Sequence, residues 1–116
     1  MNQTISIIDD NTNLLATLSI SLKIYNYNIL TFNCPDKAIK YHSDNPANFY
    51  IIDISMPKKD GFQVYKELCR IHKSERVPAI FLTAIDTMEG RSLKTTSISD
   101  YVTKPFNLEG LIARID

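Results

Sequence analysis

The chain has no excess of charge of either sign, because 13 lysines and arginines balance 13 aspartates and glutamates among 116 residues. Nucleic-acid-binding domains usually carry a basic face, so we expect no nucleic-acid contact by this domain. Cysteine is also scarce, and Cys34 and Cys69 form no Cys-x-x-C pair. Their separation favours neither a disulfide nor a zinc site and is typical of a reducing compartment.

Long apolar runs are missing as well. No stretch approaches the roughly 20 consecutive apolar residues that a membrane-spanning helix needs. The first residues, 1–4, contain no basic segment ahead of the first apolar run, which argues against a secretory signal. We therefore expect a cytoplasmic domain without membrane contact. The length suits one domain with its own core.

Strand-like apolar runs alternate with runs of helical spacing along the whole chain. The expected strands cover residues 5–8, 28–32, 49–53, 78–82 and 99–102. The expected helices cover residues 14–25, 35–41, 64–72, 87–95 and 108–115. Asn11 or Asn13 would cap the first helix. This alternation predicts an α/β domain with a parallel sheet, helices on both faces and right-handed crossovers.

Residues with distinct chemistry follow four of the expected strands. Asp9 and Asp10 follow the first strand, and Asp53 ends the third. Thr83 follows the fourth strand, and Lys104 follows the fifth. Because chemistry in open α/β folds gathers at the carboxyl edge of the sheet, we expect these residues to lie close together.

These groups together predict a pocket for phosphoryl transfer. Neighbouring carboxylates repel each other unless a hard cation lies among them, and Mg²⁺ prefers such oxygen ligands. Lys104 offers a positive charge to phosphate oxygens, and Thr83 offers a neutral donor. A carboxylate that attacks phosphorus becomes an aspartyl phosphate, so Asp53 is the candidate nucleophile. Taken alone, Asp9 and Asp10 would more often cap the next helix.

The chain resembles the receiver domain of two-component response regulators. The resemblance rests on four segments in the right order and spacing, namely Asp9-Asp10 and residues 53–61, 81–84 and 100–106. It implies a flavodoxin-like, doubly wound, five-stranded parallel sheet in the order 2-1-3-4-5. Residues 1–116 would form one receiver domain. The abrupt end of the last helix at Arg114-Ile115-Asp116 suggests a cut within or near the end of this helix, with any effector domain beyond it, and a small single-domain protein is the alternative.

The resemblance implies that Asp53 accepts a phosphoryl group from the phosphohistidine of a sensor histidine kinase or from a phosphotransfer protein. Mg²⁺ would be bound by Asp10, Asp53 and the backbone carbonyl of Ser55, while Asp9 would act through water. The domain would be a signalling switch that is phosphorylated and dephosphorylated, and not a turnover enzyme.

The resemblance assigns further roles near the ends of the fourth and fifth strands. Thr83 and Lys104 would contact the phosphoryl oxygens, and the bond before Pro105 would be cis. Thr83 and Tyr101 match a switch pair that changes the face formed by the fourth helix (87–95), the fifth strand and the last helix. That face would meet a fused or separate effector or form a homodimer.

The chain departs from the family at Ser97-Ile98, where Gly-Ala is usual, and this change concerns switching and the partner surface. Ser55 and Ile85 occupy variable positions that would tune the lifetime of the acyl phosphate. His42 and His72 are expected at the surface or at helix flanks, without a functional role.

Other functions fit the sequence less well. An atypical receiver that binds partners without phosphate would be favoured by missing acidic residues or a missing lysine, and none is missing. Phosphohydrolases with an aspartate nucleophile resemble one another in a D-x-D motif after the first strand. In this chain the two carboxylates, Asp9 and Asp10, are adjacent, and the candidate nucleophile follows the third strand. A flavin-binding domain would need a hydroxyl-rich phosphate loop there, where two carboxylates are electrostatically unsuited.

Overall fold

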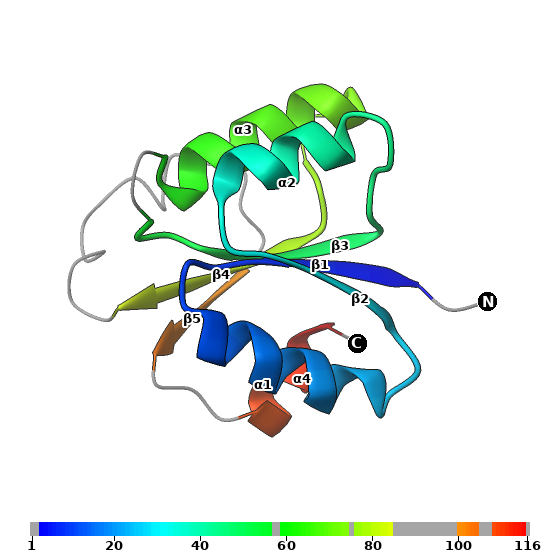
Figure 1. The fold of residues 1–116 in the computed structure, drawn as a ribbon, viewed down its shortest axis with the longest axis vertical. Helices are drawn as coiled ribbons and strands as arrows, with labels where there is room; N and C mark the ends of the chain where they lie inside the picture. The colour runs from blue at the N-terminus through cyan, green and yellow to red at the C-terminus, as the bar shows by residue number, and fades with distance from the viewer. Residues whose placement is uncertain (1–2, 57–58, 75, 85–99, 105–107, 116) are drawn as a thin grey trace.

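The computed structural model describes residues 3–56, 59–74, 76–84, 100–104 and 108–115 (Figure 1). Its strands are β1 (Thr4–Ile8), β2 (Asn28–Phe32), β3 (Phe49–Asp53), β4 (Ala79–Ala84) and β5 (Asp100–Lys104). Its helices are α1 (Thr12–Lys23), α2 (Pro35–His42), α3 (Gly61–His72) and α4 (Leu108–Ile115). The helix expected over residues 87–95 lies outside the described residues. The label α4 therefore denotes the helix Leu108–Ile115, which is the last helix expected from the sequence.

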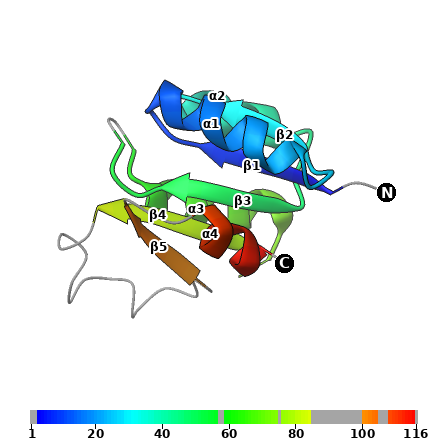
Figure 2. The ribbon, with the colours of Figure 1, turned by 90° about the horizontal axis from the view of Figure 1, so that it is seen from below.

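The strands form a parallel sheet in the order β2-β1-β3-β4-β5. Helices α2 and α3 lie together on one face of the sheet, and α1 and α4 lie on the other (Figures 1 and 2). The parallel α/β sheet that the sequence predicts is therefore confirmed. Within the part of the chain that the structure describes, no helix combines the length and apolar character needed to cross a bilayer.

The sheet separates two apolar cores because successive side chains of a strand point to opposite faces. Ile7 and Ile51 pack with the α1 residue Leu18 in one core. Ile8 and Ile52 pack with residues of α2 and α3 in the other core. Strands β1 and β3 are thus covered on both sides, which explains their continuous apolar runs.

A buried histidine attaches α2 and the segment after it to the sheet. His42 is completely buried, so the expectation that it lies at the surface is wrong. Its Nδ1 lies 2.8 Å from the carbonyl of Asn45, and its Nε2 lies 2.7 Å from the hydroxyl of Ser6. Since a carbonyl only accepts hydrogen bonds, Nδ1 donates to Asn45, and Nε2 of the neutral ring then accepts from the Ser6 hydroxyl. This arrangement uses the neutral form of the ring.

A second histidine extends this polar contact along the same face. The hydroxyl of Tyr50 accepts a hydrogen bond from the Ala47 amide at 2.9 Å and lies 2.7 Å from Nε2 of His72. The rings of His42 and Tyr50 meet edge to face with centroids 5.1 Å apart. No pattern in the sequence predicts these contacts, because the residues that form them come from different elements.

Acid should weaken the fold through these histidines. Burial lowers the pKa of His42 and of His72 below the usual 6.5, although the carbonyl of Asn45 opposes the effect at His42. The unfolded chain then binds protons more readily than the folded one. The contribution of these histidines to the free energy of unfolding is therefore fully present above about pH 6.5 and is lost as the pH falls through the lowered pKa. Urea unfolding between pH 7.5 and 5 should show a loss of at most about 1.4 kcal/mol per pH unit from His42.

The matched variant is His42→Gln, which removes the titrating ring. It should lower stability at pH 7.5 and flatten the slope between pH 6.5 and 5. An unchanged slope in this variant would show that His42 does not cause the acid sensitivity.

Candidate functional site

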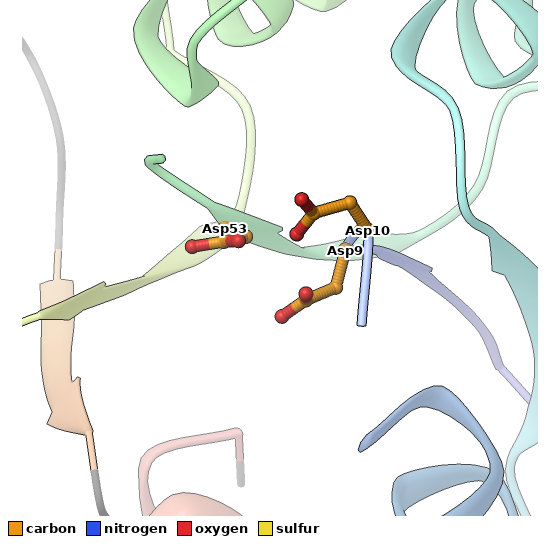
Figure 3. A group of neighbouring side chains, drawn as sticks. All are labelled: Asp9, Asp10 and Asp53. Carbon is orange, nitrogen blue, oxygen red and sulfur yellow. The ribbon is translucent and has the colours of Figure 1, made fainter. Parts of the chain in front are cut away.

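Three carboxylates meet at the carboxyl edge of the sheet, as the sequence predicts. Ile8 of β1 lies opposite Ile52 of β3, so the aspartates that follow these residues emerge side by side. One oxygen from each of Asp9, Asp10 and Asp53 lies within 4.8 Å of the others (Figure 3). Asp9 and Asp53 are buried, whereas Asp10 is exposed. The cluster therefore has a buried base and one side open to solvent.

The start of α1 positions the first carboxylate. The Asp9 side chain accepts a hydrogen bond from the Asn11 amide at 2.9 Å. Asn11 is the helix cap, because its side chain accepts from the Leu14 amide at 3.1 Å. Of the two caps that the sequence allows, the structure selects Asn11, which leaves the carboxylates of Asp9 and Asp10 at the cluster.

The loop after β3 is closed by hydrogen bonds around the third carboxylate. The Ser55 amide donates to the Asp53 side chain at 3.3 Å. The Gly61 amide donates to the Ile54 carbonyl at 2.9 Å, so the loop returns to the strand end where it began. Asp60 then caps α3, because its side chain accepts a hydrogen bond from the Gln63 amide while the Gln63 side chain accepts one from the Asp60 amide. These contacts fix the backbone on both sides of the loop.

The three carboxylates fit a hard divalent cation. They offer only oxygen donors, which Mg²⁺ prefers, and the exposed side leaves room for the waters that this ion retains. Their mutual repulsion would also fall if a cation lay among them. The donor set of Asp9, Asp10 and Asp53 is therefore suited to Mg²⁺.

Strand register places the other predicted residues at the same edge. Leu82 of β4 lies opposite Asp53, and Thr83 is the next residue of that strand. Lys104 lies opposite Ala84 and is the last residue of β5, so this strand ends two residues later than the sequence predicts. For Thr83, Tyr101 and Lys104 the structure describes the backbone but not the side chains. The predictions for Ile85, Ser97-Ile98 and Pro105 concern positions outside the described residues.

The sequence predicts no role for Lys59, which lies in the loop between β3 and α3. The Lys59 ammonium lies 3.1 Å from the Asp36 carboxylate in α2 and 2.6 Å from the Glu67 carboxylate in α3. The hydrogen bond to Glu67, followed by that to Asp36, raises the pKa of Lys59. Spacing carries no signal for such a contact, because its members belong to three separate segments.

Gly61 is the tightest point of the loop. A Cβ atom at this position would lie 2.6 Å from the Asp53 carbonyl oxygen and 2.9 Å from the Ile54 Cα, both of them backbone atoms. Gly61→Ala should therefore shift the backbone and destabilise the fold by about 1–3 kcal/mol in urea unfolding. Gly110→Ala, an exposed change within α4, is the control and should be neutral or stabilising. Equal stability of the two variants would contradict this account.

Removing one carboxylate should relieve repulsion in the cluster. Asp10→Asn keeps the side-chain size and should stabilise the metal-free domain by about 1 kcal/mol, the Coulomb energy of two charges at 4 Å in water. Thermal unfolding in a metal chelator, with Asp44→Asn as an exposed control, measures this effect. A loss of stability in Asp10→Asn alone would show that attraction to neighbouring groups outweighs the repulsion.

Comparison with known proteins places this site in a family. The pattern of the response regulator receiver domain matches residues 5–116. The chain is 34% identical over 116 residues to response regulator GtcR of Aneurinibacillus migulanus, which covers 99% of this chain and 47% of that protein. It is 33% identical over 115 residues to transcriptional regulatory protein CpxR of Klebsiella pneumoniae, at 96% and 47% coverage.

Solved structures agree with this result. The Francisella response regulator 1452 receiver domain superimposes with a TM-score of 0.83 at 27% identity and covers 98% of this chain and 93% of that one. The chain spans about half the length of the curated relatives that it matches. The match over residues 5–116 shows that the chain belongs to the response regulator receiver domain family, the regulatory domains of two-component systems.

Proposed function

We propose that Asp53 is the phosphoacceptor of this receiver domain. Its carboxylate oxygen forms a bond to phosphorus as the bond from phosphorus to the imidazole of a donor phosphohistidine breaks, and the released imidazole takes up a proton. The donor is a sensor histidine kinase or a phosphotransfer protein. The observation that carries this proposal is the buried Asp53 within 4.8 Å of Asp9 and Asp10 at the end of a central strand.

The carboxylates bind Mg²⁺ in this proposal. Receiver domains bind Mg²⁺ at an acidic pocket, and the three aspartates provide one here. Asp10, Asp53 and the backbone carbonyl of Ser55 hold the ion, and Asp9 acts through water. When bound, the ion supplies positive charge against the oxygens of the transferred group. The exposure of Asp10 supports this role, since it leaves the cluster open to solvent and to a donor.

Lys104 and Thr83 contact the phosphoryl oxygens in the same proposal. Their support is the strand register, which brings both positions to the edge where Asp53 lies. Lys104 contributes a positive charge and Thr83 a hydroxyl donor. Thr83 and Tyr101 then act as the switch pair, while Ser55 and Ile85 tune the lifetime of the acyl phosphate.

The proposal includes the complete doubly wound sheet in the order 2-1-3-4-5, a helix over residues 87–95 and a cis bond before Pro105, as the family resemblance implies. Phosphorylation changes the face formed by that helix, β5 and α4. This face is proposed to meet an effector or a second copy of the chain. Ser97-Ile98 stands where Gly-Ala is usual, and this change concerns switching and the same partner face.

A groove beside α1 supports the proposal that a donor protein docks on this domain. The groove has a volume of about 630 Å³ and lies between α1, β2 and the start of α2. Ile20 lines it and is 68% exposed, and Ile24, the residue that caps the end of α1, is 75% exposed. A donor protein that brings a phosphohistidine to Asp53 can also contact this groove and bury the exposed Ile20.

The whole protein is proposed to be a cytoplasmic response regulator. Its curated relatives are about twice the length of this chain, which favours a fused effector domain after residue 116. Contact with nucleic acid would belong to that effector and not to this domain, whose net charge is zero. A receiver that acts without phosphate remains the alternative function, but the required acidic residues and lysine are all present in the sequence.

The direct test is intact-protein mass after incubation with Mg²⁺ and acetyl phosphate. The chain should gain one phosphoryl group, and Asp53→Asn should gain none while it keeps its circular dichroism spectrum. Asp44→Asn, a change at an exposed carboxylate after α2, is the control and should be phosphorylated normally. Phosphate incorporation in Asp53→Asn at another residue would contradict the proposal. Mg²⁺ binding without any phosphorylation would favour the phosphate-independent alternative.

Lys104→Ala separates phosphorylation from its consequence. The variant should still bind Mg²⁺, because the lysine is not a metal ligand, but phosphorylation should no longer change amide hydrogen exchange in β5 and α4. Lys66→Ala, on the exposed side of α3, is the control. An exchange response in Lys104→Ala equal to that of the control would refute the role of Lys104.

A further inference from the structure

We propose that Lys59 is a positioning residue for the phosphoacceptor site, because it attaches the loop after Asp53 to both α2 and α3. This inference rests on the proposed function of Asp53. It assigns the lysine no contact with the phosphoryl group or with the metal. Its effect is to restrict the positions that the loop backbone can take.

The contacts of Lys59 span two helices. Its ammonium lies 3.1 Å from Asp36 in the first turn of α2 and 2.6 Å from Glu67 within α3. Two carboxylates thus share one ammonium, and their hydrogen bonds raise its pKa, so the lysine stays charged at neutral pH. A cation held by two helices is restricted more than one in a single surface pair.

The same loop is attached to the site at its other end. The Ser55 amide donates to the Asp53 carboxylate, and the Gly61 amide donates to the Ile54 carbonyl. Lys59 directly precedes Asp60, the cap of α3. A shift at Lys59 would therefore pass through Asp60 and the hydrogen bond from the Gly61 amide to the Ile54 carbonyl, which lies next to Asp53 and Ser55.

The ion pairs should matter more for the site than for global stability. Helices α2 and α3 are already joined to the sheet by a common core that includes Ala38, Val64 and Leu68. The side chains of Lys59, Asp36 and Glu67 are 31%, 60% and 26% exposed, so water and salt screen their attraction. A change confined to these ion pairs should leave the core unaltered, so its effect should appear in the loop.

The experiment compares Lys59→Met with Lys66→Met. Both changes remove one positive charge and keep an unbranched side chain, but Lys66 is exposed on α3. Calorimetry measures Mg²⁺ affinity, intact mass measures the phosphorylation rate with acetyl phosphate, and thermal unfolding measures stability. Lys59→Met should weaken Mg²⁺ affinity and slow phosphorylation by about two- to fivefold, the range expected for exposed ion pairs.

Three further observations separate positioning from a general structural effect. Lys59→Arg should restore Mg²⁺ affinity, because it can bridge the same carboxylates. Asp36→Asn and Glu67→Gln should each reproduce part of the loss. Near 1 M salt the difference between the chain and Lys59→Met should shrink, because the Debye length falls to about 3 Å.

Equal Mg²⁺ affinity and equal phosphorylation rate in Lys59→Met and Lys66→Met would overturn the inference. A loss of affinity that Lys59→Arg does not restore would also overturn it. If the unaltered chain binds Mg²⁺ but is not phosphorylated, the proposed function fails, and the comparison of Mg²⁺ affinities still decides the role of Lys59.

Discussion

The parallel pairing of β1 with β3 is the constraint on which the site depends. Ile8 lies opposite Ile52, so the segments that follow both strands bring their carboxylates within 4.8 Å of one another. Like charges at this distance repel, and a cluster of this kind weakens the fold unless other interactions hold it. Here the apolar residues of both strands are buried against helices on the two faces of the sheet. The two cores thus stabilise an arrangement of charges that is unfavourable by itself and is suited to a divalent cation.

The loop after β3 turns this sheet edge into a defined site. Gly61 lets the first turn of α3 lie against the backbone of Asp53, where no side chain fits. The Ser55 amide orients the carboxylate, and Lys59 connects the loop to α2 and α3. Asp53 is therefore held by strand pairing on one side and by the hydrogen bonds of Ser55 and Gly61 on the other. Such support from rigid elements is what placement of a reacting group requires.

The sequence predicted the parts of this structure that depend on local pattern or on strand order. Apolar runs marked the strands, and parallel pairing then implied that Asp9 and Asp53 would meet. It could not predict contacts between residues that only the fold brings together. His42 looked solvated at the end of a polar helix, yet Ser6 and the Asn45 carbonyl satisfy both of its ring nitrogens in the core. No role for Lys59 was predicted, because its two partners lie on other elements.

Chemical location of the phosphoryl group tests the central claim most directly. The chain would be phosphorylated with acetyl phosphate and Mg²⁺, treated with borohydride, which reduces an acyl phosphate to an alcohol, and digested for tandem mass spectrometry. The account predicts that only the peptide containing Asp53 carries the reduced side chain, and that omission of Mg²⁺ prevents its formation. Reduction at another aspartate, or at Asp53 without any need for a divalent cation, would contradict it.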